Sequence, residues 1–373
     1  MSKRIFYISP GTELGGGEVS LITLIANLDR YEPVVCVYGE GAFAERMRQM
    51  GFKLYIESYS NPISQPAFIT KLAWRIRQSR ASLVHVNTLD IRAGIATRLT
   101  NRPLIGHLRV IFPTTWVDRL FVKLSSCTIS VSNAARNYLC QTQHLSPDHF
   151  ETIYNAVDVK LTSPSPVSIR QELGLSSHAQ LIGVVGRIDP WKGMETFIEA
   201  ASLLTSKYPN LHFAIAGSPG PLPEEQAYLQ VLRKKVAELN LDHLCHFLGY
   251  RSDALGFICQ LDGLIVPSRE LFTPSGIKTE GFGRVAAEGL AMKTPVIASR
   301  IGGLPEIIQH GKTGYLFEPA NPQSLAETIC QVLDHPVQTQ AVVEEGYRHF
   351  QQAFSVATHL NNIQGLYDRI LAQ

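Results

Sequence analysis

The chain has 373 residues, of which 45% are hydrophobic and 18% charged, so it can bury sizeable cores and is not disordered by composition. At about 100–200 residues per domain, this length suggests two domains. The six cysteines are scattered without a C-x-x-C pair, which argues against a zinc cluster, a thioredoxin-like motif and a disulfide framework. We find no apolar run long enough for a membrane-spanning helix and no signal peptide, and therefore expect a cytoplasmic protein.

Positive charge is concentrated in the first half of the chain. Residues 1–160 carry 18 Lys and Arg against 12 Asp and Glu, and residues 71–123 hold ten of these bases with only two acids. Such a cluster can meet anionic lipid head groups or an anionic substrate. The alternative is a set of solvated helix faces, since bases that are separated in sequence need not share a surface. No nucleic-acid-binding motif accompanies the charge, so we expect no nucleic-acid partner.

Short apolar segments alternate with longer helical stretches in the first part of the chain. Predicted helices include 17–28, 42–50, 67–79 and 91–99. The strands predicted around them are 4–9, 34–38, 53–56, 83–86, 103–107, 127–131 and 151–154. This alternation favours a parallel sheet with helices on both faces.

A Ser/Pro-rich connector at 161–168 interrupts the pattern. A second series follows it, with strands predicted at 181–186, 212–217, 246–248, 263–267, 295–299 and 315–317. We therefore expect an α/β chain with two Rossmann-like lobes that face each other across a cleft. Ligands of such sheets bind beyond the carboxyl ends of the strands, so the cleft is the expected active site.

A glycine-rich turn follows the first predicted strand, with three consecutive glycines at 15–17. Glycine allows the backbone to approach a ligand closely, and the free N–H groups of a helix start favour an anion. The turn does not match G-x-G-x-x-G, and the alternative interpretation is an ordinary tight turn.

Two cations, Arg187 and Lys192, follow the first strand of the second series. At the carboxyl end of a parallel strand, the planar fork of Arg and the compact charge of Lys can converge on a diphosphate. The alternative is two solvated bases at a domain surface.

The strongest motif begins at Glu280, after the buried strand 263–267, and continues Gly-Phe-Gly. Its glycines suit a close backbone approach, and a helix that begins near Arg284 can direct its N-terminal amides at phosphate. Glu288 lies just over one turn into this small, apolar helix, where a buried carboxylate needs hydrogen-bond donors such as ribose hydroxyls. The alternative is a capping Glu280 and a structural Glu288.

His107 ends the predicted strand 103–107, from where it can reach the cleft, although a lone His is more often structural. His85, in the middle of strand 83–86, is predicted to be a packed residue. The sequence has no P-loop, no H-E-x-x-H, no G-x-S-x-G and no D-x-D pair. Charge on a leaving nucleotide would then be neutralised by Arg187, Lys192 and backbone amides, without a metal.

These motifs, in this order, resemble those of the family 4 retaining glycosyltransferases, and the resemblance extends over nearly the whole chain. The segments that carry it are 261–268, Glu280-Gly281-Phe282-Gly283, Glu288, 294–298, 302–306, Ser130-Val131-Ser132, 154–158, Gly186-Arg187 and Lys192-Gly193. The resemblance implies the GT-B fold, a nucleotide-sugar donor, a hydroxyl acceptor and no cofactor. It also implies an acceptor-side lobe of residues 1–160, a donor-binding lobe of residues 161–354 and a last helix, about 355–373, that crosses back to the first lobe.

The resemblance further implies which residues form the site. His107 and Glu280 would lie at the catalytic centre, Arg187 and Lys192 would bind the diphosphate, and Glu288 would hold the ribose. The full set of implied donor-binding residues is Gly16, Gly17, Arg187, Lys192, Gly217, Tyr250, Arg251, Gly281, Phe282, Gly283, Arg284 and Glu288.

The chain departs from the family pattern at 269–279, a longer link than usual between Ser268 and Glu280. This loop would either line the donor site and alter the choice of sugar or be a neutral excursion. It also leaves Glu270 as a rival acid.

The sequence thus predicts a retaining, metal-independent hexosyltransferase that uses a UDP- or GDP-sugar and a hydroxyl acceptor such as a lipid-linked sugar or a polysaccharide precursor. The alternatives are a nucleotide-sugar 2-epimerase of the same fold, a soluble small-molecule glycosyltransferase and a non-catalytic nucleotide-sugar-binding protein. The basic stretch 71–123, with Trp74 and Trp116, predicts peripheral contact with an anionic membrane at its cytoplasmic face.

Overall fold

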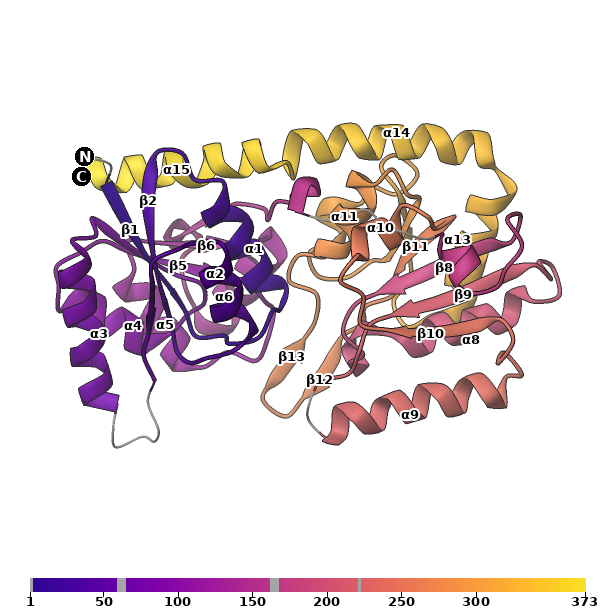
Figure 1. Cartoon of the computed structure of the whole chain (residues 1–373), viewed down its shortest axis with the longest axis horizontal. Coiled ribbons are helices and arrows are strands. Elements are labelled where there is room, and N and C mark those ends of the chain that lie inside the picture. Colours follow the sequence, from indigo (N-terminus) through magenta and orange to yellow (C-terminus); the bar gives the residue numbers. More distant parts are fainter. Residues whose placement is uncertain (1–2, 59–64, 162–167, 221–222) are drawn as a thin grey trace. The chain divides into compact units, whose positions relative to one another are not determined.

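The computed structural model describes residues 3–58, 65–161, 168–220 and 223–373. The chain divides into two compact units (Figure 1). Unit 1 comprises Met1–Ala156 and Phe354–Gln373, and unit 2 comprises Val157–Ala353. Most of the connector that we predicted at 161–168 lies outside the described residues.

Unit 1 is built on a parallel sheet of seven strands in the order β3-β2-β1-β4-β5-β6-β7. The strands are β1 (Lys3–Ser9), β2 (Tyr31–Val37), β3 (Leu54–Ile56), β4 (Leu83–Val86), β5 (Leu104–Leu108), β6 (Cys127–Ser130) and β7 (Phe150–Thr152). Successive side chains of a strand point to opposite faces, so Ile5 and Tyr7 of β1 pack into one apolar core and Phe6 and Ile8 into the other. An unbroken apolar run therefore forms a strand that is buried on both faces.

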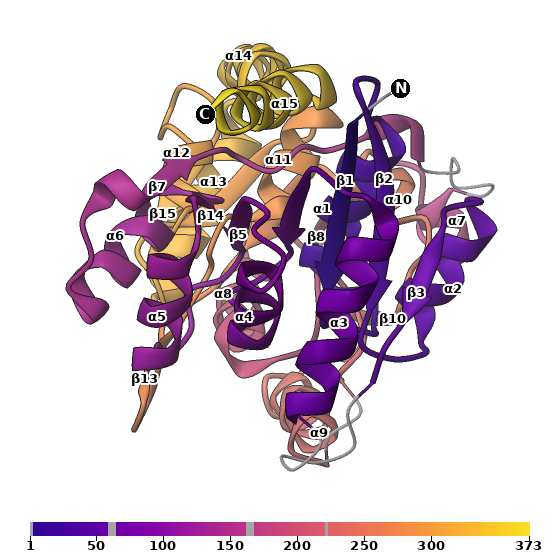
Figure 2. The same cartoon turned by 90° about the vertical axis from the view of Figure 1, so that its left-hand side faces the viewer.

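Helices cover both faces of this sheet (Figure 2). One face carries α1 (Gly16–Ala26), α2 (Ala42–Gln49) and α15 (Val356–Ala372). The other carries α3 (Gln65–Ser79), α4 (Ile91–Arg98) and α5 (Trp116–Leu124), with α6 (Asn133–Gln143) beside α5 and a short turn, η2 (Pro147–His149), before β7. The C-terminal helix α15 belongs to unit 1 because it buries Ile363, Leu366, Tyr367 and Ile370 in the same core as β1.

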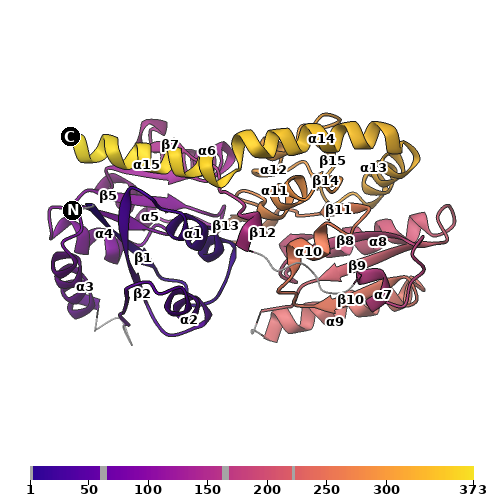
Figure 3. The ribbon, with the colours of Figure 1, turned by 45° about the horizontal axis from the view of Figure 1, so that its top comes forward.

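Unit 2 is built on a parallel sheet of six strands in the order β10-β9-β8-β11-β14-β15 (Figure 3). The strands are β8 (Gln180–Val185), β9 (Leu211–Ala216), β10 (Cys245–Gly249), β11 (Gly263–Val266), β14 (Val296–Ser299) and β15 (Tyr315–Phe317). The helical elements are η3 (Val159–Leu161), α7 (Ile169–Glu172), η4 (Pro190–Lys192), α8 (Met194–Leu204), α9 (Pro223–Glu238), α10 (Ala254–Ile258), α11 (Arg284–Ala291), α12 (Leu304–Ile307), α13 (Pro322–Asp334) and α14 (Pro336–Ala353). Helices α8, α9 and α13 cover one face of the sheet, and α10 and α11 pack on the other.

Each strand predicted from the sequence is present, with ends shifted by a few residues at most, so the two parallel α/β sheets are confirmed. One feature was not predicted from the sequence. The link 269–279 contains an antiparallel hairpin of β12 (Leu271–Thr273) and β13 (Gly276–Lys278). Its strands have only three residues each, which is too short to show an alternating apolar pattern.

Within the residues that the structure describes, no helix is long and apolar enough to span a membrane. All six cysteines are free thiols.

Candidate functional site

Lys192 and Glu280 meet in unit 2 at the carboxyl edge of the sheet. Lys192 Nζ donates to Glu280 Oε2 at 2.7 Å, and Ser268 Oγ donates to the same oxygen at 3.0 Å. The Lys192 side chain is only 21% exposed and that of Glu280 only 11%, so the pair is screened less than a surface ion pair. Ligands of parallel α/β sheets bind at this edge. The sequence motifs predicted both residues, and the fold brings them into contact.

The turn that carries Lys192 is fixed to the end of β11. Arg269 donates from its backbone N–H to Trp191 O at 2.8 Å and from Nε to Pro190 O at 2.9 Å. Gly193 adopts φ +69° and lies so close to Pro267 O that a Cβ would overlap that atom. Only glycine therefore fits at this position, and the position of the Lys192 backbone depends on it.

The hairpin that departs from the family pattern reaches the same turn. Lys278 Nζ on β13 donates to Asp189 Oδ2 at 2.8 Å. Lys278 Nζ lies 5.4 Å and Lys192 Nζ 4.0 Å from the centre of the Trp191 ring. The link thus places a second lysine beside the first. Glu270, the rival acid, is exposed and forms no ion pair with the described residues.

Helix α11 begins at Arg284, where the sequence placed its start, and carries a second buried ion pair. Arg284 Nε donates to Glu288 Oε1 at 2.7 Å, and Glu288 is 8% exposed. Arg284 Nη1 is buried and has no hydrogen-bond partner among the described residues. Gly283 precedes the helix at φ +100°, and Phe282 is buried beside it. A buried unpaired donor beside a carboxylate suits a ligand hydroxyl, which can accept from one and donate to the other.

Some predicted donor-binding residues have other surroundings. Arg187 is exposed and makes no ion pair with the described part of the chain. Tyr250 is 75% exposed. The N–H of Gly217 donates to Gly249 O at 2.7 Å, and a Cβ at Gly217 would overlap Gly186 O. Backbone packing therefore accounts for the glycine at 217.

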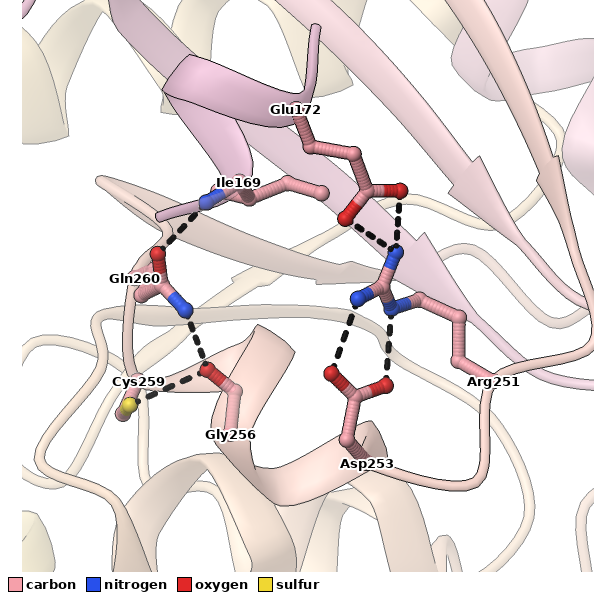
Figure 4. A network of polar contacts seen from close by, with 7 residues as sticks. All are labelled: Ile169, Glu172, Arg251, Asp253, Gly256, Cys259 and Gln260. Carbon is pink, nitrogen blue, oxygen red and sulfur yellow. Dashed lines mark hydrogen bonds and ion pairs between the residues drawn. The ribbon is translucent and has the colours of Figure 1, made fainter. Parts of the chain in front are cut away.

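Arg251 is held by two carboxylates (Figure 4). It donates from Nε and Nη2 to Asp253 at 2.9 and 2.8 Å and from Nη1 to Glu172 Oε1 at 2.8 Å. The hydrogen bonds that Arg251 donates to Asp253, together with those to Glu172, raise the pKa of Arg251 above its usual range. Beside it, Gln260 accepts from the N–H of Ile169 and donates to the carbonyl of Gly256 within α10. The guanidinium thus fastens α7 to α10, and a direct contact with a nucleotide would require it to leave both acids.

Unit 1 carries the glycine-rich turn at the start of α1. A Cβ at Gly16 would meet no atom within 4 Å, whereas one at Gly17 would lie 3.6 Å from Arg109 Cδ. Since no packing requires glycine at 16, the fold leaves the space beside this residue open, as a closely approaching ligand would need.

An arginine and two asparagines that were not assigned to the site from the sequence follow β4, β5 and β7 of unit 1. Arg109, after β5, donates from Nε to Asn87 Oδ1 at 2.7 Å and from Nη1 to Asn155 Oδ1 at 2.6 Å. Asn87 donates in turn to Gly17 O at 3.3 Å. Each residue comes shortly after a strand, at the edge where parallel strands end, and that position is the signal that could have revealed them.

The predicted His107 lies within β5 and is completely buried. Its Nδ1 contacts His85 Nε2 at 3.1 Å, and His85 Nδ1 contacts Tyr367 Oη at 2.5 Å. His107 Nε2 is buried without a hydrogen-bond partner among the described residues. Burial, assisted by the charge of Arg109, lowers the pKa of both imidazoles well below the usual range, so both are neutral. His85 is packed, as predicted, and is also bonded at both nitrogens.

A pocket of about 400 Å³ opens at the same edge of unit 1. Its lining includes Pro10, Thr88, Asp90, Arg92 and Val117. Arg92 forms a two-point ion pair with Asp90, at 2.9 and 3.2 Å. The pocket thus has an apolar wall and a compensated charge pair.

Comparison with known families accounts for most of the chain. Residues 14–161 match the family described as Glycosyltransferase Family 4, and residues 168–349 match the one described as Glycosyl transferases group 1. The chain belongs to glycosyltransferase family 4. This membership is the one that the Glu280 and Glu288 motif and the Lys192 turn indicated.

Curated relatives of this family 4 chain carry glycosyltransferase names. One is named D-inositol 3-phosphate glycosyltransferase, from Corynebacterium glutamicum (strain R), and is 32% identical over 235 residues, 61% of this chain and 53% of the relative. A protein of the same name from Saccharomonospora viridis is 25% identical over 91% of this chain and 75% of its own length. The chain spans about half the length of the corynebacterial relatives that it matches.

Solved structures place the family 4 chain in the GT-B fold. The crystal structure of Anabaena Alr3699/HepE in complex with UDP matches with a TM-score of 0.85 and 25% identity, over 98% of this chain and 100% of that one. The structure of the same protein in complex with UDP-glucose matches with a TM-score of 0.84 and 26% identity, over 98% and 99%. A glycosyltransferase from Rickettsia africae, 21% identical with a TM-score of 0.86 over 99% of both chains, shares the fold.

Proposed function

We propose that this chain is a glycosyltransferase that moves a sugar from a UDP-sugar to a hydroxyl acceptor. The observation that carries the proposal is the buried contact of Lys192, Glu280 and Ser268 at the carboxyl edge of unit 2. Its location matches the general site of nucleotide ligands in such sheets. UDP is preferred to GDP because Alr3699/HepE of Anabaena, which resembles this chain over its whole length, was solved with UDP and with UDP-glucose.

In this proposal, the charges of unit 2 bind the nucleotide part of the donor. Lys192 and the exposed Arg187 neutralise the diphosphate, whose charge increases as the sugar leaves. Glu288 accepts from a ribose hydroxyl, and the unpaired Nη1 of Arg284 donates to a neighbouring oxygen. The open space beside Gly16 lets the backbone of unit 1 come close to a phosphate.

Glu280 and His107 orient the transferred sugar through its hydroxyl groups. Glu280 already accepts from Lys192 and Ser268, an arrangement that suits a fixed hydrogen-bond acceptor better than a nucleophile. We therefore propose transfer with retention in one displacement. The acceptor oxygen forms a bond to the anomeric carbon on the face from which the diphosphate leaves. The bond between the anomeric carbon and the diphosphate oxygen breaks, and the proton of the acceptor hydroxyl passes to the departing phosphate. Unit 1 is the proposed acceptor side, with its 400 Å³ pocket as the entry.

The first test follows UDP-glucose by proton NMR in EDTA without an acceptor, so that water takes the acceptor's place. We expect slow release of UDP, with the α-anomer of glucose as the first product. Release of the β-anomer would contradict retention, and a requirement for added Mg²⁺ would contradict metal independence. An isomerised nucleotide sugar would indicate the 2-epimerase, and a bound but unchanged donor would indicate a non-catalytic binding protein.

We further propose that unit 1 contacts the cytoplasmic face of an anionic membrane, where the acceptor is a lipid-linked sugar or a polysaccharide precursor. Helices α3, α4 and α5 cover one face of the sheet, and Trp74 and Trp116 on it are 52% and 72% exposed (Figure 2). Exposed bases on or beside these helices are Arg77, Arg80, Arg98, Arg102 and Lys123. Exposed Trp with basic residues is typical of proteins that bind the membrane interface.

Reversing the charge of Arg98, Arg102 and Lys123 tests this membrane contact. Arg75 is unsuitable because it pairs with the buried Glu57. With vesicles of phosphatidylcholine and phosphatidylglycerol, we expect the binding free energy of the variant to be weaker than that of the wild type by about 1 kcal/mol per reversed base. Reversal of Arg233, in unit 2, is the control. Equal binding of the triple variant and the wild type would contradict membrane contact and favour a soluble small-molecule acceptor.

A further inference from the structure

Four completely buried side chains of unit 1 form one line of hydrogen bonds that ends at His107. Tyr7 Oη on β1 contacts Tyr367 Oη on α15 at 3.1 Å, and Tyr367 Oη contacts His85 Nδ1 on β4 at 2.5 Å. His85 Nε2 then contacts His107 Nδ1 on β5 at 3.1 Å. Three strands and one helix, remote in sequence, thus supply this series of hydrogen-bonded side chains, which we call the tyrosine–histidine line.

Each contact in the line uses one proton, and the four groups carry four. With neutral imidazoles and protonated phenols, three protons fill the three contacts and the fourth lies at one end. It is either the O–H of Tyr7 or the Nε2–H of His107. Neither end has a further partner among the described residues.

One observation places the fourth proton on His107. Tyr367 Oη lies within hydrogen-bond distance of His85 Nδ1, and because a phenol is a stronger donor than an imidazole N–H and a neutral imidazole nitrogen is the stronger acceptor, the phenol donates to the imidazole. If Tyr367 donates to His85 Nδ1, then His85 donates from Nε2 and His107 accepts at Nδ1.

We propose that Tyr367 and His85 act as positioning residues that hold His107 as the neutral Nε2–H tautomer, a hydrogen-bond donor to an oxygen of the sugar donor. This inference rests on the proposed function for the identity of that oxygen. It assigns a role to the C-terminal helix, which supplies Tyr367. It also means that His107 does not take the acceptor's proton, since its free nitrogen already carries one.

The surroundings of His107 support a neutral donor. Burial opposes protonation of His107, and so does the charge of Arg109, which lies just beyond the end of β5. Burial raises the pKa of Tyr7 and Tyr367 above the usual range, so both phenols keep their protons. A line of neutral groups therefore persists through the neutral pH range.

The test reads the tautomer of His107 directly, in the full chain without nucleotide. Protein labelled with ¹⁵N-histidine is examined by two-bond proton–nitrogen correlation, and the His107→Gln variant identifies the signals of His107. We expect the Nε2–H pattern in the wild type. The Nδ1–H pattern would overturn the proposal even if every variant failed to fold.

Two matched variants separate positioning from packing, since each removes one hydroxyl from the same Tyr7–Tyr367 contact. Tyr367→Phe removes the donor to His85, so we expect the Nδ1–H form of His107 to appear and the KM for UDP-glucose to rise about tenfold, as for one lost hydrogen bond. Tyr7→Phe leaves that donor in place and should change neither. An unchanged tautomer in Tyr367→Phe, or equal changes in both variants, would contradict the proposal. Absence of turnover in the wild type, with the Nε2–H pattern intact, would instead contradict the proposed function.

Discussion

The candidate histidines of unit 1 are neutral and hydrogen-bonded, whereas Lys192 and Arg284 of unit 2 are charged and paired with acids. In unit 1, burial lowers the pKa of His85 and His107 and the tyrosine–histidine line occupies their inner nitrogens. In unit 2, Lys192 pairs with Glu280, and Arg284 with Glu288, at partly buried positions. A buried neutral network holds a geometry, because each donor needs its partner. A partly buried ion pair can instead exchange one partner for phosphate, since the ligand restores the charge balance.

Among the variants that test this difference between the units, we expect Lys192→Ala to have the largest effect on UDP-glucose turnover. Removal of this cation deprives the leaving diphosphate of a charge and leaves Glu280 unpaired, so we expect UDP-glucose turnover to fall by about 10²–10³. The matched control is Lys207→Ala, because Lys207 also pairs with an acid, Asp334, but is exposed. Wild-type turnover in Lys192→Ala would remove Lys192 from the diphosphate site.

Acid should destabilise unit 1 more than unit 2. Burial lowers the pKa of His359 to about 4. In the fold this imidazole is neutral and donates from Nδ1 to Tyr154 O. The unfolded chain binds a further proton at this imidazole near pH 6.5 and the folded chain only near pH 4, so stability is full above pH 6.5 and falls between the two values. At 1.36 kcal/mol per pKa unit, His359 alone accounts for ~3 kcal/mol.

Urea unfolding from pH 7 to pH 4, followed by hydrogen exchange in each unit, measures this loss. His359→Gln should reduce the pH dependence of unit 1 and leave that of unit 2 unchanged. A pH dependence that is equal in the two units would contradict the assignment to the buried histidines.

A smaller difference, in stability and in UDP binding, is expected between substitutions at two glycines, Gly283 and Gly16, that we placed in the donor site from the sequence for the same reason. Gly283 adopts φ +100° and a Cβ there would overlap Leu304, so Gly283→Ala should lower the free energy of unfolding by ~1–2 kcal/mol. Gly16 begins α1 with open space beside it, so Gly16→Ala should leave stability unchanged and weaken UDP binding. Thermal unfolding and calorimetric titration measure both quantities. Normal UDP affinity in Gly16→Ala would mean that the open space is not used by the donor.

Local sequence patterns predicted the parallel sheets and the motif residues because apolar strands and glycine turns leave short-range signals. The tyrosine–histidine line leaves none. It depends on the alignment of β4 with β5, which brings His85 beside Ile105 and thus near His107, and on Tyr367, 282 residues away from His85. Long-range pairs of this kind cannot be inferred from spacing.

The opposite charges that pair with each base could not be predicted from the sequence either. Arg251 looked like a base near the nucleotide, but the fold surrounds it with Asp253 and Glu172. Lys278 belongs to the link 269–279, to which the sequence assigned no definite function. The hairpin in this link brings Lys278 to Asp189, beside Lys192. The sequence gives the number of charges in a segment, whereas their use depends on which opposite charges the fold places beside them.

The most direct test of the account is thermal unfolding of the wild type and of Glu288→Ala with UDP, GDP and ADP. A ligand that binds only the folded state raises the unfolding midpoint, by an amount equivalent to ~2.7 kcal/mol at 100 times its Kd. We predict that UDP raises the midpoint of the wild type, that Glu288→Ala loses this shift, and that Glu344→Ala, which removes an exposed partner of Lys293, keeps it. No shift with UDP, or an undiminished shift in Glu288→Ala, would contradict the assignment of a uridine nucleotide to the charged site of unit 2.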